Sequence, residues 1–142
     1  MDGGAKAHLV LRDVVEVHHR QAGQAALELR DTRLQEGLKG LALERLTPLE
    51  RLKTVIRFHL DFIQNQPGIP RLLFSEELQK GDPAFRKRMN EMVGGFLQFL
   101  TGLIQAAQLV GEIRKDINPE QHACLLLAMI QGLAFRWILS NH

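Results

Sequence analysis

Hydrophobic residues recur at helical spacing from about residue 46 onward. After Thr47-Pro48-Leu49-Glu50, apolar side chains follow every three or four positions, as an amphipathic helix requires: Leu52, Val55, Ile56, Leu60 and Ile63. The start combines an N-cap hydroxyl, a proline at the first helical position and a glutamate three residues after the cap, which is a capping box. Two prolines and a glycine in residues 65–70 predict the end of this helix, and a short helix is expected over residues 71–79.

Two longer helices are predicted in the second half of the chain. Asp82-Pro83 repeats the cap-and-proline device and opens a helix that runs to about Val110, where Gly111 is expected to end it. Asn118-Pro119-Glu120 begins a final helix that is apolar on nearly every side over residues 123–139. A helix of this kind must be covered on more than one side.

The first 45 residues are less regular. Leu27, Leu34, Leu38 and Leu41 lie on one helical face, and the polar side is formed by Glu28, Arg30, Arg33, Glu36 and Lys39. Residues 10–17 are rich in β-branched side chains, which favours a strand or an irregular segment. We therefore predict an irregular N-terminal arm over residues 1–22 and one all-α domain of about five helices over residues 23–142.

Composition indicates an ordinary soluble domain. Of the 142 residues 45% are hydrophobic and 24% are charged, and the net charge of +2 is too small to indicate a nucleic-acid surface on its own. The single cysteine, Cys124, rules out a disulfide within the chain and fits a reducing cytoplasm. The N-terminus does not read as a signal peptide. Residues 123–139 are too short for a membrane span and contain Arg136, so we expect no membrane association.

No residue set indicates an enzyme, a cofactor or a metal site. Cys124 lies in an apolar run, where a thiol is usually a small buried hydrophobe, and the adjacent His18 and His19 have diverging side chains. His59 and His122 fall on separate helices beside apolar residues and are interpreted as hydrogen-bonded boundary histidines. The basic run Arg86-Lys87-Arg88 fans around its helix and is expected to be solvated.

Phenylalanine and methionine side chains are spread over three of the predicted helices. The simple interpretation is a hydrophobic core, and the alternative is a cavity that takes a small apolar molecule, since these side chains can repack around varied shapes. The candidate ligand-binding residues are Phe58, Phe62, Phe74, Met92, Phe96 and Phe99.

Small residues form a row on the long helix, where Gly95, Gly102 and Ala106 are spaced seven and four apart. Such a row allows a second helix to approach closely, and Gly132 offers a matching position on the final helix. Two helices from each subunit would then form a four-helix bundle about a two-fold axis. The candidate homodimer interface comprises Gly95, Gly102, Ala106, Met129, Gly132, Leu133, Arg136 and Trp137.

The order of motifs over residues 46–140 resembles the C-terminal ligand-binding and dimerisation domain of TetR-type transcriptional regulators. The resemblance rests on the helix start at Thr47-Pro48-Leu49-Glu50, then Gly81-Asp82-Pro83 before a long helix, then Gly111-Glu112-Ile113-Arg114 and Asp116-Ile117-Asn118-Pro119, and last Gln131-Gly132-Leu133-Ala134 in an apolar helix. It implies a helical bundle that dimerises through its last two helices and binds a small effector in its body.

The resemblance also implies a function in transcription regulation, as a repressor whose operator binding responds to the effector. Members of the family begin with a helix-turn-helix of about fifty residues that contains a tyrosine, whereas this chain has no Tyr and too little sequence before Leu27. We therefore expect DNA binding only through a helix-turn-helix absent from this chain, lost through cloning or truncation or never encoded. The alternative is a stand-alone helical homodimer that acts through protein contacts and has no DNA-binding role.

Overall fold

The computed structural model describes residues 25, 27–34, 36–41, 43–65 and 80–140. The predicted arm over residues 1–22, the predicted short helix over residues 71–79, the adjacent His18 and His19, and the candidate ligand residue Phe74 lie outside these ranges.

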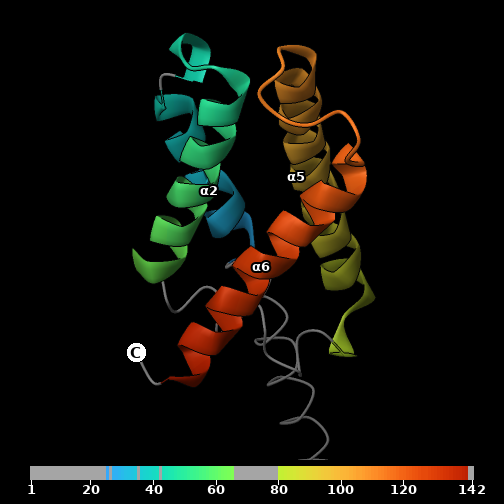
Figure 1. Cartoon of the computed structure of the whole chain (residues 1–142). Helices are drawn as coiled ribbons and strands as arrows, with labels where there is room; N and C mark the ends of the chain where they lie inside the picture. The colour runs from blue at the N-terminus through green and yellow to red at the C-terminus, as the bar shows by residue number, and fades with distance from the viewer. Residues whose placement is uncertain (1–24, 26, 35, 42, 66–79, 141–142) are drawn as a thin grey trace, which may run out of the picture.

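The described residues form an all-α arrangement, as predicted. Residues 27–34 and 36–40 are helical and are called here the N-terminal helical segment; a 3₁₀ turn, η1 (Leu43–Arg45), follows it. Three long helices complete the described part: α2 (Pro48–Asn65), α5 (Pro83–Leu109) and α6 (Pro119–Leu139). In Figure 1, α2 and α5 run side by side and α6 crosses obliquely, from the end of α5 to the far end of α2.

Local capping accounts for where these helices begin. At α2, Glu50 N–H donates to Thr47 Oγ1 at 3.3 Å while Thr47 N–H donates to Glu50 Oε2 at 3.0 Å, which is the predicted capping box. At α5, the Asp82 carboxylate accepts from Ala84 N–H at 3.0 Å, and at α6 the Asn118 side chain accepts from Gln121 N–H at 3.1 Å. The predicted starts of all three helices are confirmed.

The connector between α5 and α6 explains much of the sequence motif around Gly111. Gly111 has φ of 80°, a left-handed conformation that favours glycine after a helix C-terminus. Glu112 Oε1 accepts from Leu49 N–H at 3.3 Å, so the connector also caps the start of α2. Arg114 holds Asp116 at 2.9 Å, and Gln108 Nε2 donates to the carbonyls of Arg114 and Ile117. These bonds fix the angle at which α6 leaves α5.

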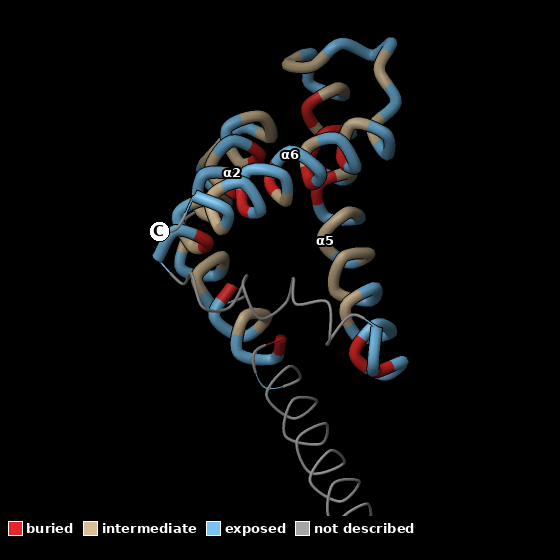
Figure 2. The backbone as a smooth tube through the Cα atoms, turned by 90° about the horizontal axis from the view of Figure 1, so that it is seen from below, coloured by how far each residue is buried: buried red, intermediate tan, exposed pale blue. Residues whose placement is uncertain are grey.

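The core lies where α2, α5 and α6 meet, near the α5–α6 connector. Six buried residues form its main cluster: Leu52, Val55, Leu100, Leu103, Ile104 and Ala123. A second cluster, around Leu27 and Phe85, joins the N-terminal helical segment to the start of α5, and a third, around Ile63, Ile130 and Ala134, joins α2 to α6. In Figure 2 the buried positions face the interior between the helices, and the outer sides of α5 and α6 are largely exposed.

The exposed sides of α5 and α6 are unusually apolar for a surface. On α6 a stripe at four-residue spacing, Leu125, Met129 and Leu133, is 55–58% exposed, and Leu109 at the end of α5 is 82% exposed. Cys124 is also exposed, so the expectation that it is buried is wrong. That expectation assumed that α6 is covered on all sides, whereas the side of α6 that carries Cys124 is exposed within one chain.

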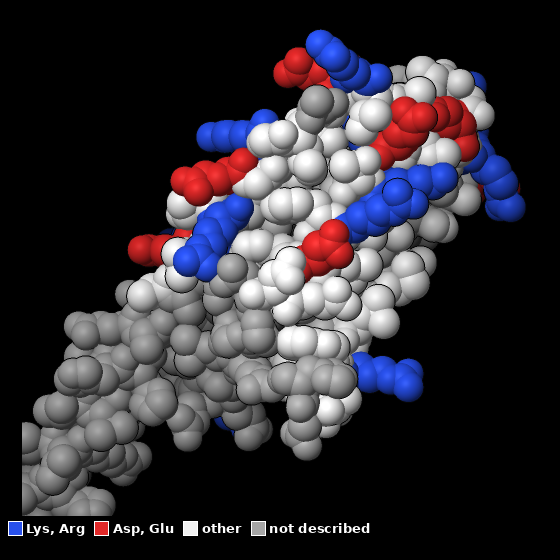
Figure 3. Space-filling view, turned by 90° about the vertical axis from the view of Figure 1, so that its left-hand side faces the viewer, with Lys and Arg blue, Asp and Glu red and all other residues white. Residues whose placement is uncertain are grey.

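The same two helices are long and apolar enough to cross a membrane by length and composition alone. This is weak evidence, because helices of a soluble helical bundle pass the same criterion. Among the described residues on the face drawn in Figure 3, basic and acidic side chains are interspersed and form no large patch of one sign. This described part of the face therefore lacks the electrostatic character of a nucleic-acid interface.

Candidate effector cavity

A cavity of about 520 Å³ lies between the N-terminal helical segment, α2, α5 and α6. Its volume falls in the range of about 300–1,000 Å³ that is usual for sites of small molecules. All four elements contribute side chains, and Leu43 of η1 adds another, so the cavity depends on how these elements pack together.

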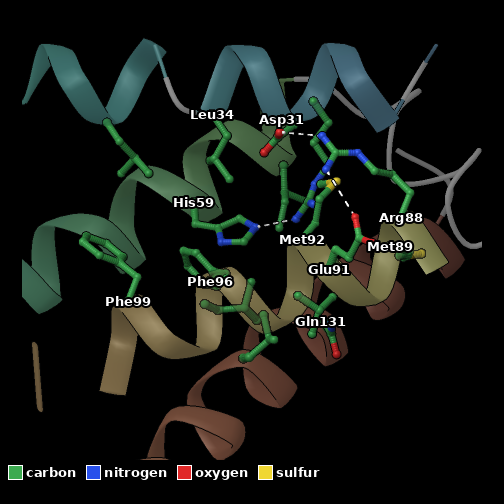
Figure 4. A pocket seen from close by; sticks show the side chains of 18 of the residues that line it. Asp31, Leu34, His59, Arg88, Met89, Glu91, Met92, Phe96, Phe99 and Gln131 are labelled. Atoms are coloured by element: carbon green, nitrogen blue, oxygen red, sulfur yellow. Dashed lines mark hydrogen bonds and ion pairs between the residues drawn. The ribbon is translucent and has the colours of Figure 1, made fainter. Parts of the chain in front are cut away.

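One side of the cavity is apolar and aromatic. Phe96 and Phe99 from α5 lie with ring centroids 6.5 Å apart, and Leu34 from the N-terminal helical segment faces them across the space in Figure 4. Ile130 and Ala134 of α6 contribute to the wall. An apolar molecule could bury its body against these side chains, which have no polar groups of their own to desolvate.

His59 of α2 is the most buried polar residue of the cavity wall, with 2% of its surface exposed. Its ring meets the ring of Phe96 edge to face at a centroid distance of 5.0 Å, and its Nε2 lies 3.2 Å from Nη2 of Arg30. Burial, with a smaller contribution from the charge of Arg30, lowers the pKa of His59 to about 4. The imidazole is therefore neutral near pH 7.

The tautomer of His59 follows from its partner. A guanidinium has no acceptor, so Arg30 must donate the bond and Nε2 of His59 must accept it. The single proton of the neutral ring is then on Nδ1. That atom is buried and has no hydrogen-bond partner among the described residues. An unsatisfied buried donor costs on the order of 1–3 kcal/mol, and such groups are rare in native structures.

Charged side chains gather at the other end of the cavity. Figure 4 shows Asp31, Arg88 and Glu91 together, on the opposite side from Phe96 and Phe99. Arg88 lies 3.3 Å from the Asp31 carboxylate and 3.8 Å from that of Glu91, so two acidic groups share its charge. Arg30 has no carboxylate within ion-pair distance among the described residues; burial lowers its pKa below the usual range, and the negative charge of Asp31 opposes part of that shift.

Three of the six candidate ligand-binding residues lie together on the cavity wall: Met92, Phe96 and Phe99. The other two described candidates do not line it. Phe58 packs its ring against Gly37, where a side chain would collide with it, and Phe62 packs on the cluster of Leu27 and Phe85.

Sequence reasoning did not identify His59 and Arg30 as cavity residues. The sequence pattern predicts a boundary position for His59, but the residue is buried and continues the stripe Leu52, Val55 and Ile63 of α2 at helical spacing. The same pattern predicts Arg30 on the polar side, but the structure places it half-buried in the cavity wall, three residues after Leu27. In both helices the spacing from buried apolar residues indicates an inward position. The polar character of the two side chains favours the opposite interpretation.

The candidate interface residues lie mostly on the exposed side of α5 and α6. Gly95, Gly102, Gly132 and Arg136 are exposed, Met129 and Leu133 belong to the exposed stripe, and Ala106 and Trp137 are half-buried. A Cβ atom built on any of the three glycines would meet nothing within 4 Å. Packing within the described part of the chain therefore does not require glycine at these helical positions, where it costs up to about 1 kcal/mol relative to alanine. Gly95 also lines the cavity.

The described residues contain no group of three or more His, Cys, Asp or Glu side chains placed to hold a metal ion. The chemistry of the cavity is therefore that of apolar contact, hydrogen bonding and charge.

Comparison with known proteins identifies the family. The family described as "Tetracyclin repressor-like, C-terminal domain" matches residues 48–141, about two thirds of the chain. The fatty acid metabolism regulator protein of Bacillus subtilis is 22% identical over 109 residues, which cover 77% of this chain and 54% of that protein. The chain thus spans about half the length of this curated relative. No solved structure shows a significant match. From the family match over residues 48–141, the chain belongs to the TetR family of transcriptional regulators and contains their C-terminal domain.

Proposed function

We propose that this domain binds a small, largely apolar effector in the cavity and forms a homodimer through α5 and α6. The observation that carries the proposal is that the same two helices, α5 and α6, form both the cavity wall and the exposed apolar surface. α5 and α6 supply much of the cavity wall, and their outer sides form the exposed apolar surface. A molecule that moves these helices from inside must also change the packing of the two subunits.

The match to a regulator of fatty acid metabolism, which covers 77% of this chain, supports an apolar effector, since a fatty acid is largely apolar. In a complete regulator of this family, paired helix-turn-helix heads bind an operator, and a change in dimer geometry alters their spacing. DNA would be bound by such a head and not by the helices described here. A cytoplasmic location fits this function and the single exposed thiol of Cys124.

Substitution of Phe96 tests whether the cavity is a binding site. The neutral fluorescent probe N-phenyl-1-naphthylamine should bind the wild-type protein, and Phe96→Ala should weaken its binding about three- to tenfold, because an aromatic contact is worth about 0.5–1.5 kcal/mol. Phe96 is only partly buried beside the main core. We therefore expect a modest loss of stability in the absence of the probe.

Leu100→Ala is the matched control, one turn along α5 and fully buried in the main core. It should lower the free energy of unfolding by about 2–5 kcal/mol and leave probe affinity unchanged well below its melting temperature. If Phe96→Ala instead behaves like Leu100→Ala, with a large loss of stability and unaltered probe binding, Phe96 is plain core and the proposal fails.

A further inference from the structure

The cavity has a polarity that the proposed function does not explain. A site for a wholly apolar molecule would be lined by apolar groups throughout, because burying an unpaired polar or charged group is costly. Here the guanidinium of Arg30 lies 3.2 Å from the buried imidazole of His59, and both residues line the cavity. A ligand that binds here should therefore offer a polar group to the guanidinium and the imidazole.

The charges that line the cavity leave an excess of one cation among the described residues. The cations are Arg30, Lys39 and Arg88, and the anions are Asp31 and Glu91. Arg88 lies within ion-pair distance of both carboxylates, so these three groups together carry one net negative charge. The two positive charges of Arg30 and the exposed Lys39, on the N-terminal helical segment, account for the excess. Arg30 is the more buried of the two, and its hydrogen bond goes to a neutral ring.

The hydrogen-bonding groups at this point are donors. Arg30 has five N–H groups and spends one of them on Nε2 of His59, and the proton of His59 is on Nδ1, which has no partner. The missing complement is therefore an acceptor with negative charge. A carboxylate provides two acceptor oxygens and matches the planar fork of a guanidinium.

We propose that the effector is an amphipathic acid, with an apolar body against Phe96 and Phe99 and a carboxylate bound by Arg30, with His59 as a second donor on the same wall. This inference rests on the proposed function, because it assumes that the cavity binds a ligand, and it adds the chemical class of that ligand. Arg30 selects the head group, and the aromatic side of the cavity accepts the chain.

Three probes of equal chain length test the head group: decanoate, decan-1-ol and decylammonium. Isothermal titration of the wild-type protein, below the concentrations at which the probes form micelles, should give decanoate at least tenfold higher affinity than decanol, because hydrogen bonds to charged groups are worth about 1.5–3 kcal/mol. Decylammonium should bind most weakly. Equal affinity for decanoate and decanol would overturn the inference and leave the proposed function intact. Failure of all three probes to bind would contradict the proposed function as well.

Two variants of the N-terminal helical segment assign the selectivity to one residue. Arg30→Met should lower decanoate affinity about tenfold or more and leave decanol affinity within about twofold. Lys39→Met removes a cation from the same segment at an exposed position, and it should change decanoate affinity by less than about threefold, since exposed charges contribute little. Loss of selectivity in Lys39→Met but not in Arg30→Met would overturn the assignment. The wild-type probe series remains decisive if Arg30→Met does not fold.

Discussion

The paired substitution Gly102→Arg and Leu133→Glu should convert a dimer into a monomer of 16.1 kDa. Leu133 is 55% exposed, and a side chain built on Gly102 meets open space, so both new side chains fit the isolated subunit. In a four-helix interface the arginine would occupy the closest approach of the helices, and the glutamate would bury an unpaired charge. An interface of this kind buries on the order of 2,000 Å² and would not tolerate either change.

Light scattering after size-exclusion chromatography measures the outcome. The wild-type protein should have twice the mass of one chain at micromolar concentration, and the variant should have the mass of one chain and a greater tendency to aggregate, because its apolar stripe is uncovered. The matched control places the same two charges on neutral, exposed positions of α2, as Gln64→Arg with Asn65→Glu, and should remain dimeric. A variant that keeps the dimer mass would exclude this surface as the interface.

Acidification should destabilise the fold through His59. Its pKa is about 4 in the folded protein and 6.5 in the unfolded chain, so the unfolded state binds more protons between these two values. The contribution of neutral His59 to stability therefore falls as the pH drops through this window and is fully lost below the folded pKa. A difference of this size corresponds to roughly 3 kcal/mol at 1.36 kcal/mol per pKa unit.

Urea unfolding at about pH 7.5, 5.5 and 4, at one protein concentration, separates this contribution from packing. His59→Leu should be less stable than wild type at pH 7.5, because Arg30 loses its partner, but its stability should change less between pH 7.5 and 4. The part of the pH dependence of unfolding free energy that is lost in His59→Leu is the contribution of the imidazole. An unchanged slope in His59→Leu would mean that His59 is not buried in its neutral form.

The helix boundaries could be predicted from the sequence because each is determined by neighbouring residues. The capping box of Thr47 and Glu50, the Asp82 and Asn118 caps and the left-handed Gly111 all act over three residues or fewer. The family resemblance over the same residues has the same origin, since these signals recur in a fixed order along the chain.

The polar part of the cavity could not be predicted in this way, because it depends on tertiary contacts. Arg30 and His59 are 29 residues apart, and only the packing of the N-terminal helical segment on α2 brings them together. A long arginine side chain can also bury its stem while its position reads as polar. Of the six candidate ligand-binding residues, Phe58 and Phe62 pack outside the cavity and Phe74 lies outside the described residues. Periodicity gives the inward face of a helix, but it does not say which neighbouring helix that face contacts.

The exposed thiol of Cys124 shows a further limit of the sequence pattern. An all-round apolar helix indicates that every side is covered, but it does not say whether the cover comes from the same chain. In α6 the side that carries Cys124 and Leu125 is uncovered within one subunit. We predict that a second subunit covers this exposed side of α6 through the candidate interface. Measuring the oligomeric state tests that prediction.

Native mass spectrometry of the freshly purified wild-type protein tests the central claim most directly, because one spectrum reports subunit number and bound small molecules together. We predict a species of two chains, each of 16.1 kDa, that carries added mass from an effector or takes up added decanoate at one molecule per chain. A single chain that stays bare when decanoate is supplied would contradict both parts of the account, the dimer through α5 and α6 and the effector cavity between them.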